Sequence, residues 1–227
     1  MFIFRLIVGV SLNVAIFGAL LFIPAGTLNW WRAWVFLGAV AASAVTTMFA
    51  VFRSRPDLLN ERFKPPIQKG QPVADRIVLL LLLISFCGLV AFIPLDVFRF
   101  HLMRKPGVLV SSAGLVLFAA GWWIMSLALK ENTFAAPVVR YQEERRHTVI
   151  STGVYGVVRH PMYTGAVAFL TGIPLWLESY AAALLAALPI ATLVLRIRIE
   201  ERFLGRELKG YDAYTKKTRY RLIPFLW

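Results

Sequence analysis

The amino-acid sequence predicts an all-α, polytopic integral membrane protein with about six transmembrane helices. Of its 227 residues, 59% are hydrophobic and only 16% are charged, which is more apolar than a soluble domain allows. The apolar residues form runs close to the roughly 20 residues that a helix needs to cross a bilayer. Lysine and arginine collect between these runs, as they do in loops beside anionic lipid head groups.

Four long apolar runs form an N-terminal membrane block within residues 1–130. They cover residues 6–24, 34–52, 77–97 and 108–129. Two shorter runs, 162–177 and 180–195, are separated by little more than Glu178 and Ser179 and predict a tight helical hairpin. Whether both legs cross the bilayer stays open, because each is shorter than about 20 residues. Residues 131–227, which hold the hairpin and the polar segments around it, form a second region.

The distribution of basic residues predicts the orientation of the chain. The proline-rich segment 53–76 carries many of them and should face the cytoplasm. The N-terminus, the segment 130–160 and the C-terminal tail then lie on the same side. Arg99, Arg104 and Lys105 would face outward, so the opposite orientation stays open. The short chain, without an evident signal or retention motif, favours a prokaryotic inner membrane.

Several classes of site and partner are not expected. The net charge of +13 is explained by loops that meet membrane lipids, so nucleic acid is not an expected partner. Cys87 is the single cysteine and lies in an apolar run, which excludes an internal disulfide. Three histidines without paired cysteines predict no metal site.

Polar and ionisable residues gather beside the hairpin, where burying them is costly unless they are used. Residues 147–155 read HTVISTGVY, and residues 159–165 read RHPMYTG. Pro161 suits the first position of a helix, because its missing N–H would have no partner there. Residues 200–204 read EERFL, and Arg196 shares a helix face with Glu200 because the two are four residues apart.

With these motifs the chain resembles the isoprenylcysteine carboxyl methyltransferases and, more loosely, the small integral-membrane methyltransferases that include the phospholipid methyltransferases. YDAY at 211–214 and RLIP at 221–224 extend the resemblance, which covers residues 132–227. It implies S-adenosylmethionine as cofactor and a C-terminal cofactor-binding segment. The implied reaction is methyl transfer to a lipophilic or lipidated acceptor, such as the carboxylate of a prenylated cysteine. The N-terminal block resembles the family only in being apolar helices.

The resemblance also implies the residues of the site. Arg196 falls where the family places its acceptor-binding arginine, and Arg159 is either a partner of the cofactor carboxylate or a structural clamp. Gln142 matches the family's glutamine only with a small gap. A carboxylate acceptor needs no general base, and Glu200 can pair with the ammonium group of the cofactor. The implied cofactor-binding residues are Gln142, His147, Thr148, Val149, Ile150, Tyr155, His160, Pro161, Met162, Tyr163 and Glu200.

Two other functions stay open. Membrane sterol reductases have a similar C-terminal half but use NADPH, and they typically carry Asn where this chain has Met162. A non-enzymatic membrane protein is the second alternative, although the apolar runs contain too little charge for an ion path. Among methyl acceptors, a prenylated cysteine carboxylate, a phospholipid amine, a small thiol and an isoprenoid-like acid are all compatible with the sequence.

Overall fold

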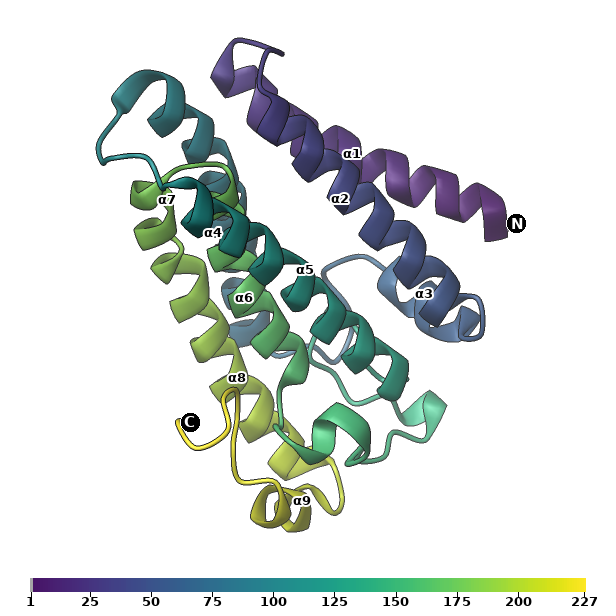
Figure 1. Cartoon of the computed structure of the whole chain (residues 1–227). Coiled ribbons are helices and arrows are strands. Elements are labelled where there is room, and N and C mark those ends of the chain that lie inside the picture. The colour runs from purple at the N-terminus through teal and green to yellow at the C-terminus, as the bar shows by residue number, and fades with distance from the viewer. Residues whose placement is uncertain (1) are drawn as a thin grey trace.

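The structure, a computed structural model, describes residues 2–227 and contains no β-strand within them (Figure 1). The shorter helices are α3 (Pro56–Arg62), α7 (Tyr180–Leu185) and α9 (Tyr211–Lys217). Single turns of π-helix extend α2 (η1, Met48–Phe52) and α4 (η2, Asp96–Phe100), and short 3-10 turns lie at η3 (Glu143–Arg145) and η4 (Gly153–Gly156). The longer helices are α1 (Phe2–Ala25), α2 (Trp31–Thr47), α4 (Val73–Leu95), α5 (Val108–Glu131), α6 (Pro161–Trp176) and α8 (Ala187–Glu207).

The all-α membrane class is confirmed, with five candidate spans among the described residues where the sequence predicted about six. These are Ile3–Ala25, Trp31–Phe52, Val73–Phe100, Val108–Glu131 and Tyr180–Glu207. The first leg of the hairpin, α6, has 16 residues. At 1.5 Å per residue it is about 24 Å long, shorter than the hydrocarbon core of about 30 Å. Because α6 is packed inside the bundle against α5, lipid thickness does not set its length.

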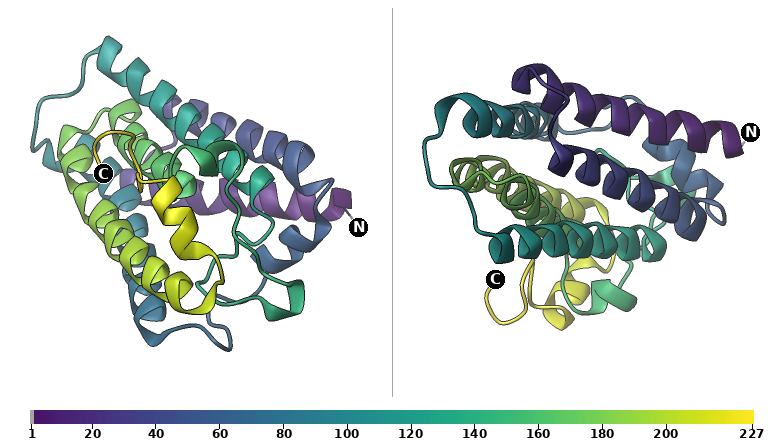
Figure 2. Two further views of the ribbon diagram at one scale, coloured as in Figure 1. Left: turned by 90° about the horizontal axis from the view of Figure 1, so that it is seen from below. Right: turned by 45° about the horizontal axis from the view of Figure 1, so that its top comes forward.

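The two ends of the helix bundle differ in character (Figures 1 and 2). The N-terminus, α3, the segment between α5 and α6, and α9 gather at one end. The α1–α2 turn, the α4–α5 connection and α7 lie at the other end. The segment 53–76 therefore shares its end of the molecule with the segment 130–160, as the charge pattern predicts.

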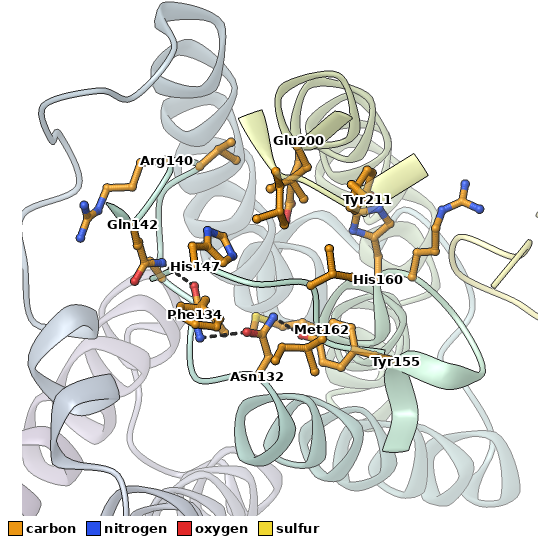
Figure 3. Close-up of a pocket in the computed structure, with 18 of the residues that line it drawn as sticks. Asn132, Phe134, Arg140, Gln142, His147, Tyr155, His160, Met162, Glu200 and Tyr211 are labelled. Atoms are coloured by element: carbon orange, nitrogen blue, oxygen red, sulfur yellow. Dashed lines mark hydrogen bonds between the residues drawn. The ribbon is translucent and has the colours of Figure 1, made fainter. Parts of the chain in front are cut away.

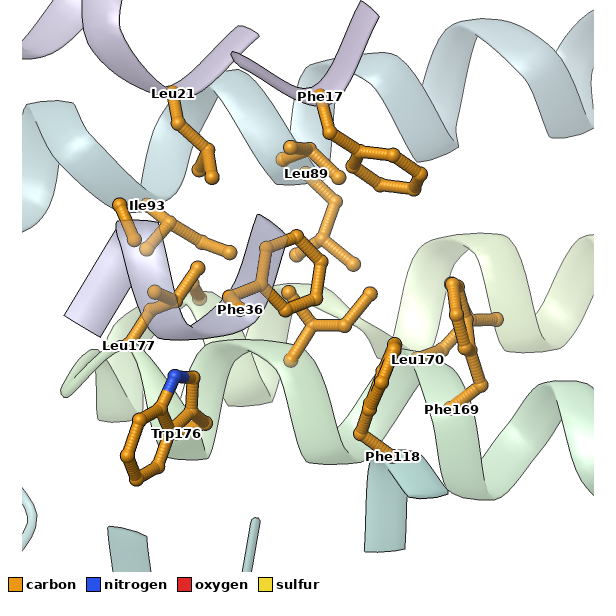
Figure 4. Close-up of a cluster of buried hydrophobic side chains, with 14 of the residues drawn as sticks. Phe17, Leu21, Phe36, Leu89, Ile93, Phe118, Phe169, Leu170, Trp176 and Leu177 are labelled. Carbon is orange, nitrogen blue, oxygen red and sulfur yellow. The ribbon is translucent and has the colours of Figure 1, made fainter. Parts of the chain in front are cut away.

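One hydrophobic core joins the N-terminal helices to the hairpin (Figure 4). Phe36 of α2 lies at its centre, with its ring centroid 5.4 Å from that of Phe17 and 5.2 Å from that of Phe118. The Phe118 ring then contacts Phe169 of α6 at 5.3 Å. Such aromatic pairs add about 0.5–1.5 kcal/mol each beyond their buried area. The chain of rings fixes α1, α2, α5 and α6 relative to one another.

Polar contacts tie the α1–α2 end of the bundle together. The Ser179 hydroxyl donates to an Asp96 carboxylate oxygen at 2.6 Å, which links the hairpin turn to the end of α4. Arg32 pairs with Glu178 at 3.1 Å, and its guanidinium lies 4.7 Å from the ring centroid of Trp176. These contacts hold the hairpin turn against α2 and α4, far from the motif residues.

Helices α5 and α6 approach so closely that glycines are required between them. A Cβ atom added to Gly121 would lie 2.5 Å from the carbonyl oxygen of Gly165, and one added to Gly165 would lie 2.5 Å from the carbonyl oxygen of Gly121. Gly114 and Gly172 form a similar contact further along the helices, since a Cβ on Gly172 would lie 2.6 Å from the Gly114 carbonyl oxygen. Small residues allow this spacing in membrane helices. The contact positions α6, and with it the residues 159–163 at its start.

Gly121→Ala is expected to destabilise the protein by about 1–3 kcal/mol, the usual effect of overpacking. The atoms that crowd the new methyl group belong to backbone, so they cannot rotate away. Gly88→Ala is the matched control, because its Cβ would meet nothing within 4 Å. Thermal unfolding of both variants in detergent measures the difference. Equal midpoints would contradict the close contact between α5 and α6.

Candidate active site

A pocket, here the polar pocket, lies at the α3 and α9 end of the bundle between the segment 132–160, the start of α6 and the end of α8 (Figure 3). Its cavity volume is about 110 Å³. Asn132, for which the sequence left open a capping role or a role toward the cofactor, lines it, as do Phe134 and Arg140, which the sequence did not predict as site residues. The predicted residues that line it are Gln142, His147, Thr148, Val149, Ile150, Tyr155, Arg159, His160, Met162, Tyr163, Arg196 and Glu200.

Pro161 is the predicted site residue that does not line the polar pocket. It is buried at the first turn of α6, where proline is well suited to begin a helix. His160 precedes it as the N-cap residue and faces the pocket. Pro161 therefore acts on the pocket through the position of its neighbours.

Glu200 enters the polar pocket from α8. The Tyr163 hydroxyl donates a hydrogen bond of 2.7 Å to its Oε2 atom. Oε1 has no hydrogen-bond partner among the described residues, so one carboxylate oxygen stays available to a ligand. The ring of Tyr163 in turn stacks on His160, with centroids 5.6 Å apart and an interplanar angle of 24°. The two aromatic rings hold the carboxylate in one place.

Arg196 is buried, and its guanidinium group is hydrogen-bonded to other parts of the protein. Its Nε atom donates to Asp75 at 3.0 Å, and Nη2 donates to the carbonyl oxygen of Pro137. Asp75 lies at the start of α4 and is fully buried. Its second oxygen accepts from Gln71 at 2.7 Å and from the backbone N–H of Val139 at 3.0 Å. The pair ties α4 to α8 and to the segment that walls the pocket.

Arg159 makes the contacts of a structural clamp, one of the two roles that the sequence left open. Its Nε atom donates to Glu201 at 2.7 Å, and Nη1 donates to the carbonyl oxygens of Thr218 and Arg219 at 2.9 and 2.7 Å. Glu201 also accepts from Arg221 at 2.8 Å. These bonds fasten the C-terminal segment against α8 and the start of α6, which closes one side of the polar pocket.

Tyr155 forms another wall of the polar pocket and is held from two sides. Its hydroxyl accepts from the Asn132 amide at 3.2 Å, and its carbonyl oxygen accepts from the Tyr214 hydroxyl at 2.8 Å. Burial raises the pKa of Tyr214 to about 12 and raises that of Tyr155 above its ordinary range. Both side chains therefore stay uncharged hydrogen-bonding phenols at physiological pH.

The segment after α5 presents His147 to the polar pocket. The side-chain amide of Gln142 donates to the backbone carbonyl oxygen of Phe134 at 2.7 Å. The backbone carbonyl oxygen of Gln142 accepts from the backbone N–H of His147 at 3.3 Å. The imidazole lies against the ring of Phe134 with centroids 4.4 Å apart. Its Nδ1 atom is buried and has no hydrogen-bond partner among the described residues. A buried ring nitrogen without a partner is a position that a ligand can satisfy.

The charge state of His147 gives a prediction about pH. Burial first, and then the positive charges of Arg145 and Arg140, lowers its pKa from 6.5 to about 4. Between these two values the unfolded chain binds the proton more readily than the folded one, so stability falls as pH decreases through this window. We expect the unfolding midpoint to drop less between pH 7 and pH 5 in His147→Gln than in the unchanged protein. His101→Gln, at an exposed histidine, is the control and should keep the full drop.

A second pocket, here the apolar pocket, lies within the bundle between α1, α2, α4, α5, α6 and α8. Its cavity volume is about 610 Å³. Met162 lines both pockets and is the one described residue that does so. The residues that line the apolar pocket are mostly aliphatic and aromatic, for example Phe17, Leu82, Phe86 and Phe169. A polar and an apolar pocket thus meet at the first turn of α6.

Residues 109–209 match the family model for phospholipid methyltransferases. Over these residues the chain is similar to the phospholipid methyltransferase family. The match runs from the start of α5 past the end of α8, so the matched residues hold most of the polar pocket. No curated protein matches the chain. The resemblance to integral-membrane methyltransferases is confirmed, and the family supports membrane methyltransferase activity.

Two residues that hold the site region together were not predicted as site residues from the sequence. Asp75 lies 121 positions before its partner Arg196 and outside the residues that match the family model. One signal existed, since an aspartate at the start of an apolar run is costly unless it is paired. Glu201 was part of the motif at 200–204, but its contacts with Arg159 and Arg221 depend on how the C-terminal segment folds back.

Proposed function

We propose that this protein transfers the methyl group of S-adenosylmethionine to the carboxylate of a lipophilic acceptor, such as a prenylated cysteine or an analogue. The family supports the coarser statement, methyl transfer in a membrane. The observation that carries the proposal is the carboxylate of Glu200, which faces the polar pocket with one oxygen unpaired beside the other motif residues.

The residues of the polar pocket fit the chemistry of this cofactor. The unpaired oxygen of Glu200 can accept from the cofactor ammonium group in a charge-assisted hydrogen bond. The unpartnered Nδ1 of His147 offers a further hydrogen bond, and the Phe134 ring packs against the imidazole and holds it in place. Burial keeps His147 uncharged above about pH 4, so it adds no positive charge beside the sulfonium.

Bound S-adenosylmethionine supplies an electrophilic methyl group that a carboxylate oxygen can take by direct displacement, without a general base. The chain's own task is to hold donor and acceptor in line and to exclude water. Met162 lines both pockets, so the polar pocket would hold the cofactor while the apolar pocket holds the acceptor tail. In this proposal residues 131–227 supply the cofactor site and residues 1–130 contribute most of the acceptor cavity.

The proposed setting is a prokaryotic inner membrane with both chain ends in the cytoplasm. The basic segment 53–76 and the polar pocket lie at the same end of the bundle (Figure 1). The positive-inside rule places this end in the cytoplasm, where S-adenosylmethionine is available. The acceptor would then enter the apolar pocket sideways from the bilayer, whose lipids are the surrounding partners.

Calorimetric titration of the purified protein with S-adenosylhomocysteine, and separately with NADPH, tests the cofactor. We expect saturable binding of S-adenosylhomocysteine and none of NADPH. Binding of NADPH alone would move the protein to the reductases. Binding of neither would favour a non-enzymatic role.

A further inference from the structure

Arg62 ends the short helix α3 and reaches the wall of the apolar pocket. Pro56 starts α3 at a position where proline is favoured, and Leu58 and Leu59 bury its inner face. The Arg62 side chain is half-buried, and its Nη1 atom donates to the carbonyl oxygen of Ala135 at 3.2 Å. Arg62 is the only charged residue among the described residues that line the apolar pocket.

The charge of Arg62 lacks the partner that comparable arginines have. Arg196 is paired with Asp75 at 3.0 Å, Arg159 with Glu201 at 2.7 Å, and Arg140 with Glu61 at 3.0 Å. No described carboxylate lies within ion-pair distance of Arg62. Burial, and then the nearby charge of Arg196, lowers the pKa of Arg62, which means that its positive charge is unfavourable in this environment. A bound anion would offset that penalty.

Arg62 also lies where the two pockets meet. The carbonyl oxygen that it binds belongs to Ala135, which lines the polar pocket. Ala135 packs with Val51, Leu58 and Met162 in one small apolar cluster. Met162 lines both pockets, and Arg62 lines the apolar one. A head group held by Arg62 would therefore lie beside the wall that separates the acceptor tail from the cofactor.

We infer that Arg62 binds the carboxylate of the methyl acceptor and selects carboxylates over amines. The inference rests on the proposed function and changes the role that the sequence gave to Arg196. Two of the three guanidinium nitrogens of Arg196 are occupied by Asp75 and Pro137, so Arg196 positions the pocket wall. Arg62 keeps a planar donor group for a carboxylate, and it repels the ammonium group of an amine acceptor.

Binding of two matched probes to the protein saturated with S-adenosylhomocysteine tests this assignment. The probes are N-acetyl-S-farnesylcysteine, whose blocked amine leaves only a carboxylate, and its neutral carboxamide. We expect the unchanged protein to bind the carboxylate about 30-fold more tightly than the carboxamide, in keeping with a partly desolvated charge pair. Arg62→Gln should reduce this preference to about one while S-adenosylhomocysteine binds as before.

Two variants separate a specific contact from a general effect of charge or folding. Arg53→Gln removes an exposed charge from the same basic segment and should keep the full preference. Arg62→Lys keeps the charge and should retain part of it. Equal affinities for the two probes in the unchanged protein, or a full preference in Arg62→Gln, would overturn the assignment. Failure of the unchanged protein to bind S-adenosylhomocysteine would instead overturn the proposed function on which the assignment depends.

Discussion

Glu200→Ala is expected to reduce the affinity for S-adenosylhomocysteine by about 100-fold or more, because it removes the carboxylate that pairs with a partly desolvated ammonium group. The fold should persist, since the one side-chain hydrogen bond that Glu200 makes among the described residues comes from Tyr163. Glu200→Gln should lose nearly as much affinity, because the amide keeps an acceptor for Tyr163 but carries no charge. Calorimetry and thermal unfolding of the same samples measure both quantities.

Glu207→Ala is the matched control for this loss. Glu207 ends the same helix, is exposed and makes no side-chain hydrogen bond or ion pair among the described residues. Its removal should leave the affinity unchanged. Normal binding by a folded Glu200→Ala protein would remove Glu200 from the site, together with the observation that carries the proposed function.

Asp75→Ala is expected to destabilise the protein by about 3–5 kcal/mol, the effect of breaking a buried ion pair by removing one partner. Asp75 is fully buried, and three groups donate to it, from Arg196, Gln71 and Val139. Its loss leaves the buried Arg196 cation uncompensated next to the half-buried Arg62. Unfolding in detergent, followed by circular dichroism, measures the change in stability.

Two comparisons show whether this effect comes from the ion pair. Asp57→Ala removes an exposed carboxylate of α3 and should cause little change. The double variant Asp75→Leu with Arg196→Met replaces both charges by apolar groups and should regain much of the lost stability. A double variant as unstable as Asp75→Ala would contradict a pairwise role for the two side chains.

Sequence reasoning could predict most of the polar pocket because its residues belong to short ordered motifs. His147 to Tyr155 and His160 to Tyr163 are close in the chain, and Glu200 lies on an apolar helix with a definite face. When the helices form and pack, these segments are brought to the same end of the bundle. Their placement around one pocket therefore follows from the local pattern, while their role toward the cofactor stays a proposal.

The contributions of the N-terminal block could not be predicted in the same way. Arg62 is one of several basic residues in the segment 53–76, and nothing in their spacing separates it from Arg53 or Arg55. Its position depends on the short helix α3, which brings its guanidinium within hydrogen-bond distance of Ala135, a residue 73 positions later in the chain. Whether α6 crosses the bilayer was also left open, because an apolar run does not show whether lipid or protein surrounds it. Tertiary packing decides both features.

Transfer of a radiolabelled methyl group from S-adenosylmethionine to N-acetyl-S-farnesylcysteine tests the central claim most directly. We expect label in the organic extract that mild alkali releases as methanol, because the product is a methyl ester. The opposite result is alkali-stable label on the amine of an added phospholipid and none on the carboxylate probe. That result would contradict methyl transfer to a carboxylate.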